Sequence, residues 1–173
     1  MIGIIGAGVV GSRVAETLRL FSLQQIYVND IEPIIAQRLA GRLSGGRSQL
    51  SVVDRNSIKS VKVVVLCGPS PHFSIAKELL DTGVSVVSTS DDIADCLNLF
   101  TLSQLALENK ATLIVGAASS PGMSGLLVRH LAESFDSIDE VHVALHGTGG
   151  PACARQHHRA LSGQSIGWHD GEW

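Results

Sequence analysis

The first eleven residues constrain the fold of this chain more than any other stretch. Residues 2–5 are apolar apart from one glycine and can form a short buried strand, and Gly6, Gly8 and Gly11 follow in the spacing G-x-G-x-x-G. An apolar pattern with helical period then covers residues 9–20. The opening of the chain therefore predicts a strand, a tight turn and a helix that begins inside the glycines.

Each glycine of this pattern has its own physical purpose. The first permits the tight turn, the second lets the backbone approach a pyrophosphate, and the third lets helix and strand pack closely. The N–H groups at the helix start, including those of Val9 and Val10, can bind phosphate oxygens. A second predicted strand, residues 25–29, leads to Asp30, roughly 20 residues beyond the glycines, where a carboxylate accepts hydrogen bonds from an adenosine ribose. The pattern favours a bound dinucleotide over a turn with a purely structural role.

The composition agrees with one parallel α/β core. Hydrophobic residues make up 45% of the chain and the mean hydropathy is +0.25, which is high for a soluble protein. Strands of a parallel sheet are covered on both faces, however, and are apolar throughout. No apolar run approaches the roughly 18 residues of a membrane-spanning helix, and the N-terminus lacks the positive region of a signal peptide. We expect a cytoplasmic protein without membrane contact.

The net charge and the spacing of the cysteines and histidines argue against nucleic-acid-binding, disulfide-rich and metal-binding proteins. The net charge of −3 and the absence of a basic tract give no footprint for nucleic acid. Cys67, Cys96 and Cys153 are far apart and form no C-x-x-C pair, so neither a disulfide framework nor a zinc site is indicated. His142 and His146 would lie about 13 Å apart along a strand, too far for one metal ion. We therefore expect small-molecule partners or a second copy of the chain.

The remaining apolar stretches of the sequence predict strands and helices in alternation. Strands are expected at residues 49–53, 61–67, 84–87 and 112–115, and helices at residues 33–43, 55–60, 73–82, 92–107 and 123–132. This alternation predicts an α/β fold, a Rossmann-type doubly wound parallel sheet, as a dinucleotide-binding domain over residues 1–137.

The period changes after this domain. Residues 141–146 alternate between apolar and other side chains, as in a strand with one covered face, residues 152–161 favour a helix, and residues 166–173 resemble a hairpin. Residues 138–173 therefore predict the start of an incomplete second α+β domain. This segment could pack on the first domain, join a homodimer, or open a substrate and dimerisation domain, which is the interpretation we favour.

Polar residues follow the predicted strand at 84–87. Residues 88–92, beginning with Ser88, lie where open α/β sheets bind their ligands. Asp91 and Asp92 are equally suited to cap the helix that follows. Capping and ligand contact both remain open for these residues.

Four stretches, residues 3–11, 63–69, 83–92 and 116–127, together resemble the NAD(P)-binding domain of saccharopine dehydrogenase-like reductases, relatives of homoserine dehydrogenase and dihydrodipicolinate reductase. The resemblance covers about residues 1–146. It implies that the turn formed by Cys67, Gly68 and Pro69 lies beside the ribose and nicotinamide, and that a loop containing Ser119 and Pro121 closes the far side. In such reductases a second domain supplies most substrate contacts and the dimer interface.

No residue is fixed by the sequence as a proton donor. His72 lies just beyond the Gly68–Pro69 turn and could act as an acid, or could merely begin a helix. Arg155 shares a helix face with Arg159 and could bind a carboxylate substrate, such as a small amino or keto acid, or could be solvated. Neighbouring His157 and His158 cannot both point into a cleft. The candidate catalytic residues are therefore His72, His157 and Arg155.

The cofactor prediction rests on Asp30. Its charge should repel the extra phosphate of NADP, and no arginine follows within the next seven residues, so we expect NAD with NADP as the alternative; Arg38 on the second predicted helix could simply be solvated. The leading hypothesis is an NAD(P)-dependent oxidoreductase of the saccharopine dehydrogenase-like group. Its competitors are a noncatalytic NAD(P)-binding regulatory protein, a truncated product without turnover, and a methyltransferase that binds S-adenosylmethionine over a similar glycine turn.

Overall fold

The computed structural model of the chain describes residues 1–21, 24–45, 49–147 and 150–161. The strands are β1 (Ile2–Ile5), β2 (Ile26–Asn29), β3 (Leu50–Val52), β4 (Val63–Leu66), β5 (Ser85–Ser88) and β6 (Leu113–Ile114). The helices are α1 (Val9–Phe21), α2 (Pro33–Arg42), α3 (Phe73–Asp81), α4 (Ile93–Phe100), α5 (Ser103–Glu108), α6 (Met123–Ala132) and α7 (Pro151–Ala160), and a 3-10 helix covers Ser57–Ser60. None of these helices combines the length and apolar character that a bilayer crossing requires.

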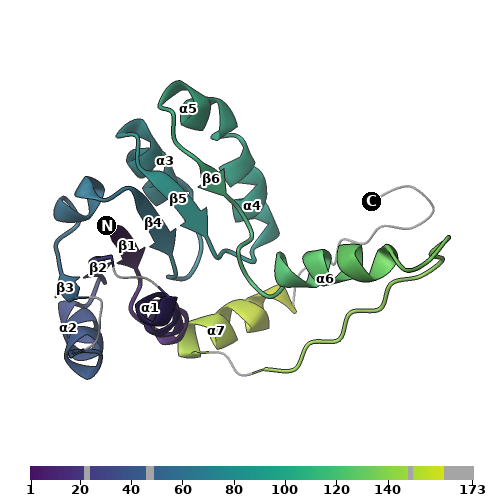
Figure 1. The fold of residues 1–173 in the computed structure, drawn as a ribbon, viewed down its shortest axis with the longest axis horizontal. Coiled ribbons are helices and arrows are strands. Elements are labelled where there is room, and N and C mark those ends of the chain that lie inside the picture. The colour runs from purple at the N-terminus through teal and green to yellow at the C-terminus, as the bar shows by residue number, and fades with distance from the viewer. Residues whose placement is uncertain (22–23, 46–48, 148–149, 162–173) are drawn as a thin grey trace.

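The strands form one parallel sheet in the order β3-β2-β1-β4-β5-β6 (Figure 1). At the end of β1, Ile5 pairs with Asn29 of β2 on one side and with Leu66 of β4 on the other. The direction in which successive strands are added reverses between β1 and β4. The predicted Rossmann-type doubly wound fold is thereby confirmed, and the crevice outside the carboxyl ends of β1 and β4 is its topological switch point.

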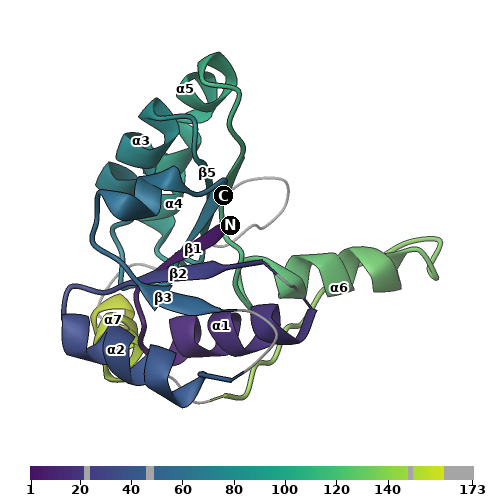
Figure 2. The ribbon, with the colours of Figure 1, turned by 60° about the vertical axis from the view of Figure 1, so that its left-hand side comes forward.

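Two apolar clusters cover the two faces of the sheet. Neighbouring side chains of a strand point to opposite faces, so Ile4 belongs to the cluster of α1 and α2 while Ile5 belongs to that of α3, α4 and α5. Ala15 of α1 and Leu79 of α3 are fully buried in these two clusters. Figure 2 shows the two helix layers on opposite sides of the strands. This double coverage explains the continuous apolar sequence of β4.

The helix predicted over residues 92–107 is wrong in one respect, because two separate helices, α4 and α5, form there. The Thr101 hydroxyl donates to the Asn98 carbonyl at 2.6 Å, and the Leu102 N–H donates to the Leu99 carbonyl at 3.0 Å. Such short-range bonds compete with the α-helical ladder. The chain bends at this point and buries Leu102.

The segment that follows the sheet has a different character. None of residues 117–147 is buried, and α6 extends away from the sheet with the chain returning beside it (Figure 1). The predicted strand over residues 141–146 is wrong, because these residues pair with no described strand and Val143 is 53% exposed. A strand requires partners for its backbone groups. The predicted helix over residues 152–161 is confirmed as α7, and the predicted hairpin over residues 166–173 lies outside the described residues.

Candidate functional site

The glycine turn after β1 is closely packed at two of its three glycines. Gly6 adopts φ +96°, and a Cβ there would lie 2.6 Å from the backbone nitrogen of Gly68. A Cβ on Gly11 would overlap the carbonyl oxygen of Gly6 and would also approach the side chain of Cys67. These positions require glycine because backbone from the turn itself and from the turn after β4 occupies the space.

Gly8 differs from the other two glycines, because a Cβ there would meet no atom within 4 Å. It directly precedes α1, whose first N–H groups, including those of Val9 and Val10, have no partner within the helix. Both valine side chains are exposed. Open space beside free amides at the positive end of a helix is suited to a pyrophosphate.

Asp30 holds the glycine turn from the end of β2. Its Oδ2 accepts a hydrogen bond from the Ala7 N–H at 2.6 Å, and its Oδ1 accepts one from the Glu32 N–H at 2.9 Å. The sequence predicted a ribose contact for Asp30 and missed the bond to the turn. A carboxylate has about four acceptor positions, so two amide bonds leave capacity for ribose hydroxyls.

The turn after β4 forms the other wall of the switch point. The Cys67 side chain is buried, and this burial raises the pKa of its thiol to about 12. Gly68 lies against Gly6, and Pro69 is exposed. The structure thus brings these three predicted residues beside the glycine turn, where Cys67 supplies packing and not a reactive thiolate.

His72 lies at the start of α3 but is only 2% exposed. Its Nε2 is 2.9 Å from the Gly68 carbonyl oxygen, and its Nδ1 is 2.9 Å from the Oγ of Ser88, which is also fully buried. The hydrogen bond between the His72 ring and Ser88 would have to break before His72 could act as a proton donor or the Ser88 hydroxyl could contact the cofactor directly.

Two aspartates organise the helix starts around His72. Asp95 accepts hydrogen bonds from the backbone N–H of His72 at 3.0 and 2.9 Å and from that of Phe73 at 3.2 Å. Asp92 accepts from the Asp95 N–H at 2.8 Å, so capping is confirmed for Asp92. The role of Asp95 could not be predicted from the sequence, since a polar residue in the first turn of a helix is ordinarily exposed.

Helix α7 contacts the carboxyl edge of the sheet. The Gln156 amide nitrogen donates to Ser70 Oγ and to Asp91 Oδ1, each at 2.9 Å, which links the turns after β4 and β5. Gly150, just before α7, lies close enough to Val9 that a Cβ would be 3.0 Å from its side chain. Figure 1 shows α7 beside α1 below the strand ends. Nothing in the sequence distinguished Gln156 from its charged neighbours.

The remaining predicted site residues belong to the loop after β6 and to α7. The Ala117 N–H donates to the Ser88 carbonyl at 2.9 Å, which joins the loop of residues 116–122 to β5. Within it, Ser119 and Pro121 are exposed. Arg155 of α7 is also exposed, and His157 belongs to the same helix.

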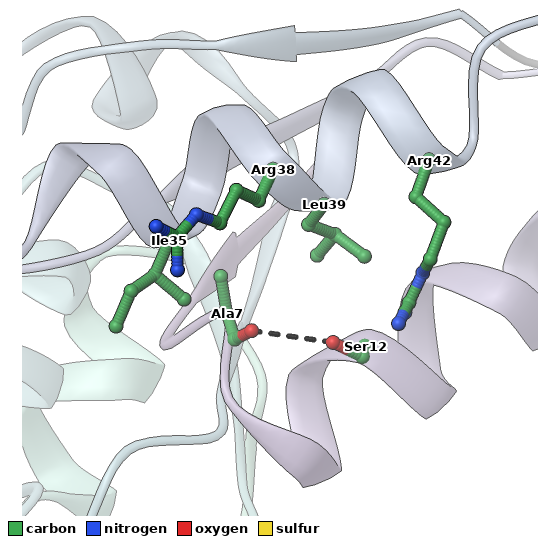
Figure 3. Close-up of a pocket in the computed structure, with 6 residues that line it drawn as sticks. All are labelled: Ala7, Ser12, Ile35, Arg38, Leu39 and Arg42. Carbon is green, nitrogen blue, oxygen red and sulfur yellow. Dashed lines mark hydrogen bonds between the residues drawn. The ribbon is translucent and has the colours of Figure 1, made fainter.

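A pocket of about 200 Å³ lies between α1 and α2 behind the glycine turn (Figure 3). Its lining residues are Ala7, Ser12, Ile35, Arg38, Leu39 and Arg42. Arg42 is paired with Glu16 at 3.0 Å, and Ser12 donates to the Ala7 carbonyl at 3.2 Å. Arg38 and Ala7 both line this pocket, and the Ala7 N–H is the donor to Asp30.

No protein-family model matches this sequence, and no curated protein matches it either. Solved structures do resemble it. Apo saccharopine dehydrogenase (L-Glu forming) from Saccharomyces cerevisiae superposes with a TM-score of 0.63 at 21% identity, covering 77% of this chain and 30% of that chain. UDP-N-acetylglucosamine 3-dehydrogenase GnnA from Acidithiobacillus ferrooxidans gives 0.59 at 20% identity, covering 77% and 41%.

A third structure, the WlbA dehydrogenase from Bordetella pertussis in complex with NADH and UDP-GlcNAcA, gives a TM-score of 0.57 at 17% identity and covers 77% of this chain and 41% of that chain. At such identities the likeness shows the Rossmann-type fold alone. The chain spans less than half the length of each of these three dehydrogenases.

Proposed function

We propose that this chain binds NAD over the glycine turn and is the cofactor-binding portion of an NAD(P)-dependent oxidoreductase. The observation that carries the proposal is the contrast among the glycines: backbone fills the space at Gly6 and Gly11, whereas Gly8 faces open space at the start of α1. The similar dehydrogenase folds support it, and WlbA was solved with NADH. The adenosine ribose would be bound by Asp30, and the pyrophosphate by the amides of Val9 and Val10.

The nicotinamide half would lie beside the turn of Cys67, Gly68 and Pro69, with the loop of Ser119 and Pro121 on its far side. The bound cofactor would supply the hydride chemistry. The chain itself would orient the cofactor and exclude water through this closely packed turn. We propose the saccharopine dehydrogenase-like group for this chain, because that group is the most specific resemblance of the sequence.

A small amino or keto acid is the proposed substrate class. Arg155 is exposed on α7, which contacts the turns after β4 and β5, and a guanidinium binds a carboxylate in a bidentate manner. His157 on the same helix is the remaining candidate for proton transfer. The exposed apolar residues of α6 and of 133–145 would be covered by a second domain or by the partner in a cytoplasmic homodimer.

A noncatalytic NAD(P)-binding protein is the second candidate. It is favoured by the two hydrogen bonds of the His72 ring, which engage both ring nitrogens of the histidine nearest in sequence to the turn after β4. The two candidates share the cofactor site and differ only in turnover.

Calorimetric titration with NAD⁺, NADP⁺ and S-adenosylmethionine tests the proposal. We expect NAD⁺ to bind more tightly than NADP⁺ because of Asp30, and S-adenosylmethionine not to bind. Tighter NADP⁺ binding would instead assign the Arg38 pocket to the additional phosphate. Gly8→Ala should weaken NAD⁺ binding by about tenfold or more without loss of stability, since its methyl group enters the open space.

Turnover then separates the enzyme from the noncatalytic protein. NADH oxidation and NAD⁺ reduction would be followed with a panel of amino and keto acids. Turnover of one substrate supports the oxidoreductase, whereas tight NAD⁺ binding without turnover of any panel member supports the noncatalytic protein. Absence of NAD⁺ binding to the wild-type chain contradicts both.

A further inference from the structure

The buried ring of His72 joins two separate segments at the carboxyl edge of the sheet. Nε2 contacts the carbonyl oxygen of Gly68 in the turn after β4, and Nδ1 contacts Oγ of Ser88 at the end of β5, each at 2.9 Å. The backbone N–H of the same residue is held by both carboxylate oxygens of Asp95 in α4. His72 is thereby fixed in position from three elements.

The hydrogen bonds of this cluster have a defined direction. A carbonyl oxygen can only accept, so the contact with Gly68 requires a proton on Nε2. Nδ1 can then accept from the Ser88 hydroxyl, and Ser88 Oγ in turn accepts from the Ser90 N–H at 3.2 Å. In this arrangement the Nε2–H, the Ser88 hydroxyl and the Ser90 N–H each have an acceptor.

The Gly68 carbonyl is the only polar group of its peptide bond, because the next residue is Pro69, which has no N–H. His72 binds this carbonyl from the interior of the protein, while Pro69 is exposed at the surface of the turn. The nitrogen of Gly68 lies against Gly6 across the switch point. The ring of His72 therefore holds the Gly68 carbonyl on the interior side of the turn.

We propose that His72 is a positioning residue for the nicotinamide half of the dinucleotide. Its Nε2–H fixes the turn of residues 67–70 so that the Gly68 carbonyl is directed inward and Pro69 lies on the exposed side of the turn, where the nicotinamide half would bind. This inference rests on the proposed function. The adenosine half is assigned to the glycine turn and Asp30, which make no hydrogen bond with His72 among the described residues, so the two halves of the ligand should respond differently.

The test compares NAD⁺ with ADP, which lacks the nicotinamide half, by calorimetric titration of the full chain. His72→Leu removes the ring nitrogens, whereas His72→Gln retains an N–H donor that can reach the Gly68 carbonyl. We expect His72→Leu to weaken NAD⁺ binding by about tenfold, which corresponds to one lost interaction of about 1.4 kcal/mol, and to change ADP binding less than twofold. His72→Gln should keep NAD⁺ binding within about threefold, and His130→Leu, a change at an exposed position of α6, should have no effect.

Parallel loss of NAD⁺ and ADP binding in His72→Leu, or equal loss of NAD⁺ binding in the Gln and Leu variants, would overturn the inference while the proposed function stands. If His72→Leu does not fold, His72→Asn replaces it: its shorter side chain keeps a polar group but removes the Nε2 contact with the Gly68 carbonyl, and unchanged NAD⁺ binding would likewise overturn the inference. Nitrogen chemical shifts of the ring in the wild-type chain should report a proton on Nε2, and a proton on Nδ1 alone would contradict the contact with Gly68. Wild-type protein that binds no NAD⁺ overturns the proposed function and this inference together.

Discussion

Residues 1–116 and residues 117–147 both contain apolar stretches, but only the first region buries them. In β4, Val64 and Leu66 are 0% and 1% exposed, because helices cover both faces of the sheet. In the second region, Val141 and Leu145 are 53% and 64% exposed although they alternate as in a strand. An apolar pattern therefore predicts that one face of an element is suited to burial. Whether that element forms a buried strand depends on whether another layer of the protein covers this face.

The largest expected difference between the two regions is in the reactivity of a cysteine thiol. In a chain with Cys96→Ser, Cys153→Ser and Ser134→Cys, one thiol is Cys67 in the first region and the other is exposed in the second. Burial raises the pKa of Cys67 from 9.0 to about 12, so its thiolate fraction at pH 8 should be about a thousandfold lower. Reaction with a disulfide reagent should show one fast and one very slow thiol.

The same burial gives a pH dependence with a definite sign. The folded state disfavours the Cys67 thiolate, so stability is retained below the ordinary pKa of 9.0 and is lost as the pH rises toward about 12. Two thiols that react equally fast in the folded protein would contradict the burial of Cys67.

A pair of leucine truncations tests packing directly. Leu79→Ala removes a side chain with no exposed surface from the cluster of α3, α4 and α5 and should lower the free energy of unfolding by about 3 kcal/mol. Leu127→Ala in α6, where the side chain is 54% exposed, should lower it by less than about 0.5 kcal/mol. Urea unfolding measures both. Similar losses would mean that α6 packs in a core of its own.

A pair of glycine substitutions separates close approach from open space. In Gly11→Ala the new methyl group would overlap the Gly6 carbonyl, so the free energy of unfolding should fall by about 2 kcal/mol and NAD⁺ binding should be lost. In α6, Gly125 has no neighbouring atom within 4 Å of a new Cβ, and Gly125→Ala should stabilise the chain by up to about 1 kcal/mol. An unchanged Gly11→Ala protein would show that the glycine turn is not closely packed.

The smallest expected effect concerns surface charge, where the two regions should behave alike. Glu78 is paired with Lys59 at 2.6 Å and with Arg55 at 2.9 Å, and these cations lower the pKa of the carboxyl group. Because Glu78 is 41% exposed, Glu78→Gln should cost only about 0.5 kcal/mol.

This contribution is present above the ordinary glutamate pKa of 4.5 and is lost as the pH falls through the lower folded-state value. The free energies of unfolding of the wild type and Glu78→Gln should be measured at low and at high salt, and the two proteins should differ only at low salt. Glu133→Gln, at an exposed position of the second region, is the control, and a larger loss there would contradict the account.

The sequence was sufficient where structure is set by local chemistry and by double coverage. The central strands β1 and β4 could be predicted because strands covered on both faces are predominantly apolar, and the turn at Gly6 because its spacing is diagnostic. Capping by Asp92 was one of two open interpretations, and the structure decided it.

Other features depend on individual hydrogen bonds, one of them local and the others between distant residues. The interruption between α4 and α5 follows from a bond of the Thr101 hydroxyl to Asn98, which competes with a helix that the pattern alone favours. The bonds of Asp95 to His72 and of Gln156 to the turns after β4 and β5 join residues far apart in the chain, and no periodicity reports them. Long-range polar contacts of this kind could not be read from the sequence.

The most direct test of the account is amide NMR of the wild-type chain during titration with NAD⁺. The account predicts saturable shifts that are largest at Gly8, Val9 and Val10, with a second group at Gly68 across the switch point, and little change in α6. Unperturbed amides at Gly8, Val9 and Val10 at NAD⁺ saturation would contradict the central claim that a dinucleotide lies over the glycine turn.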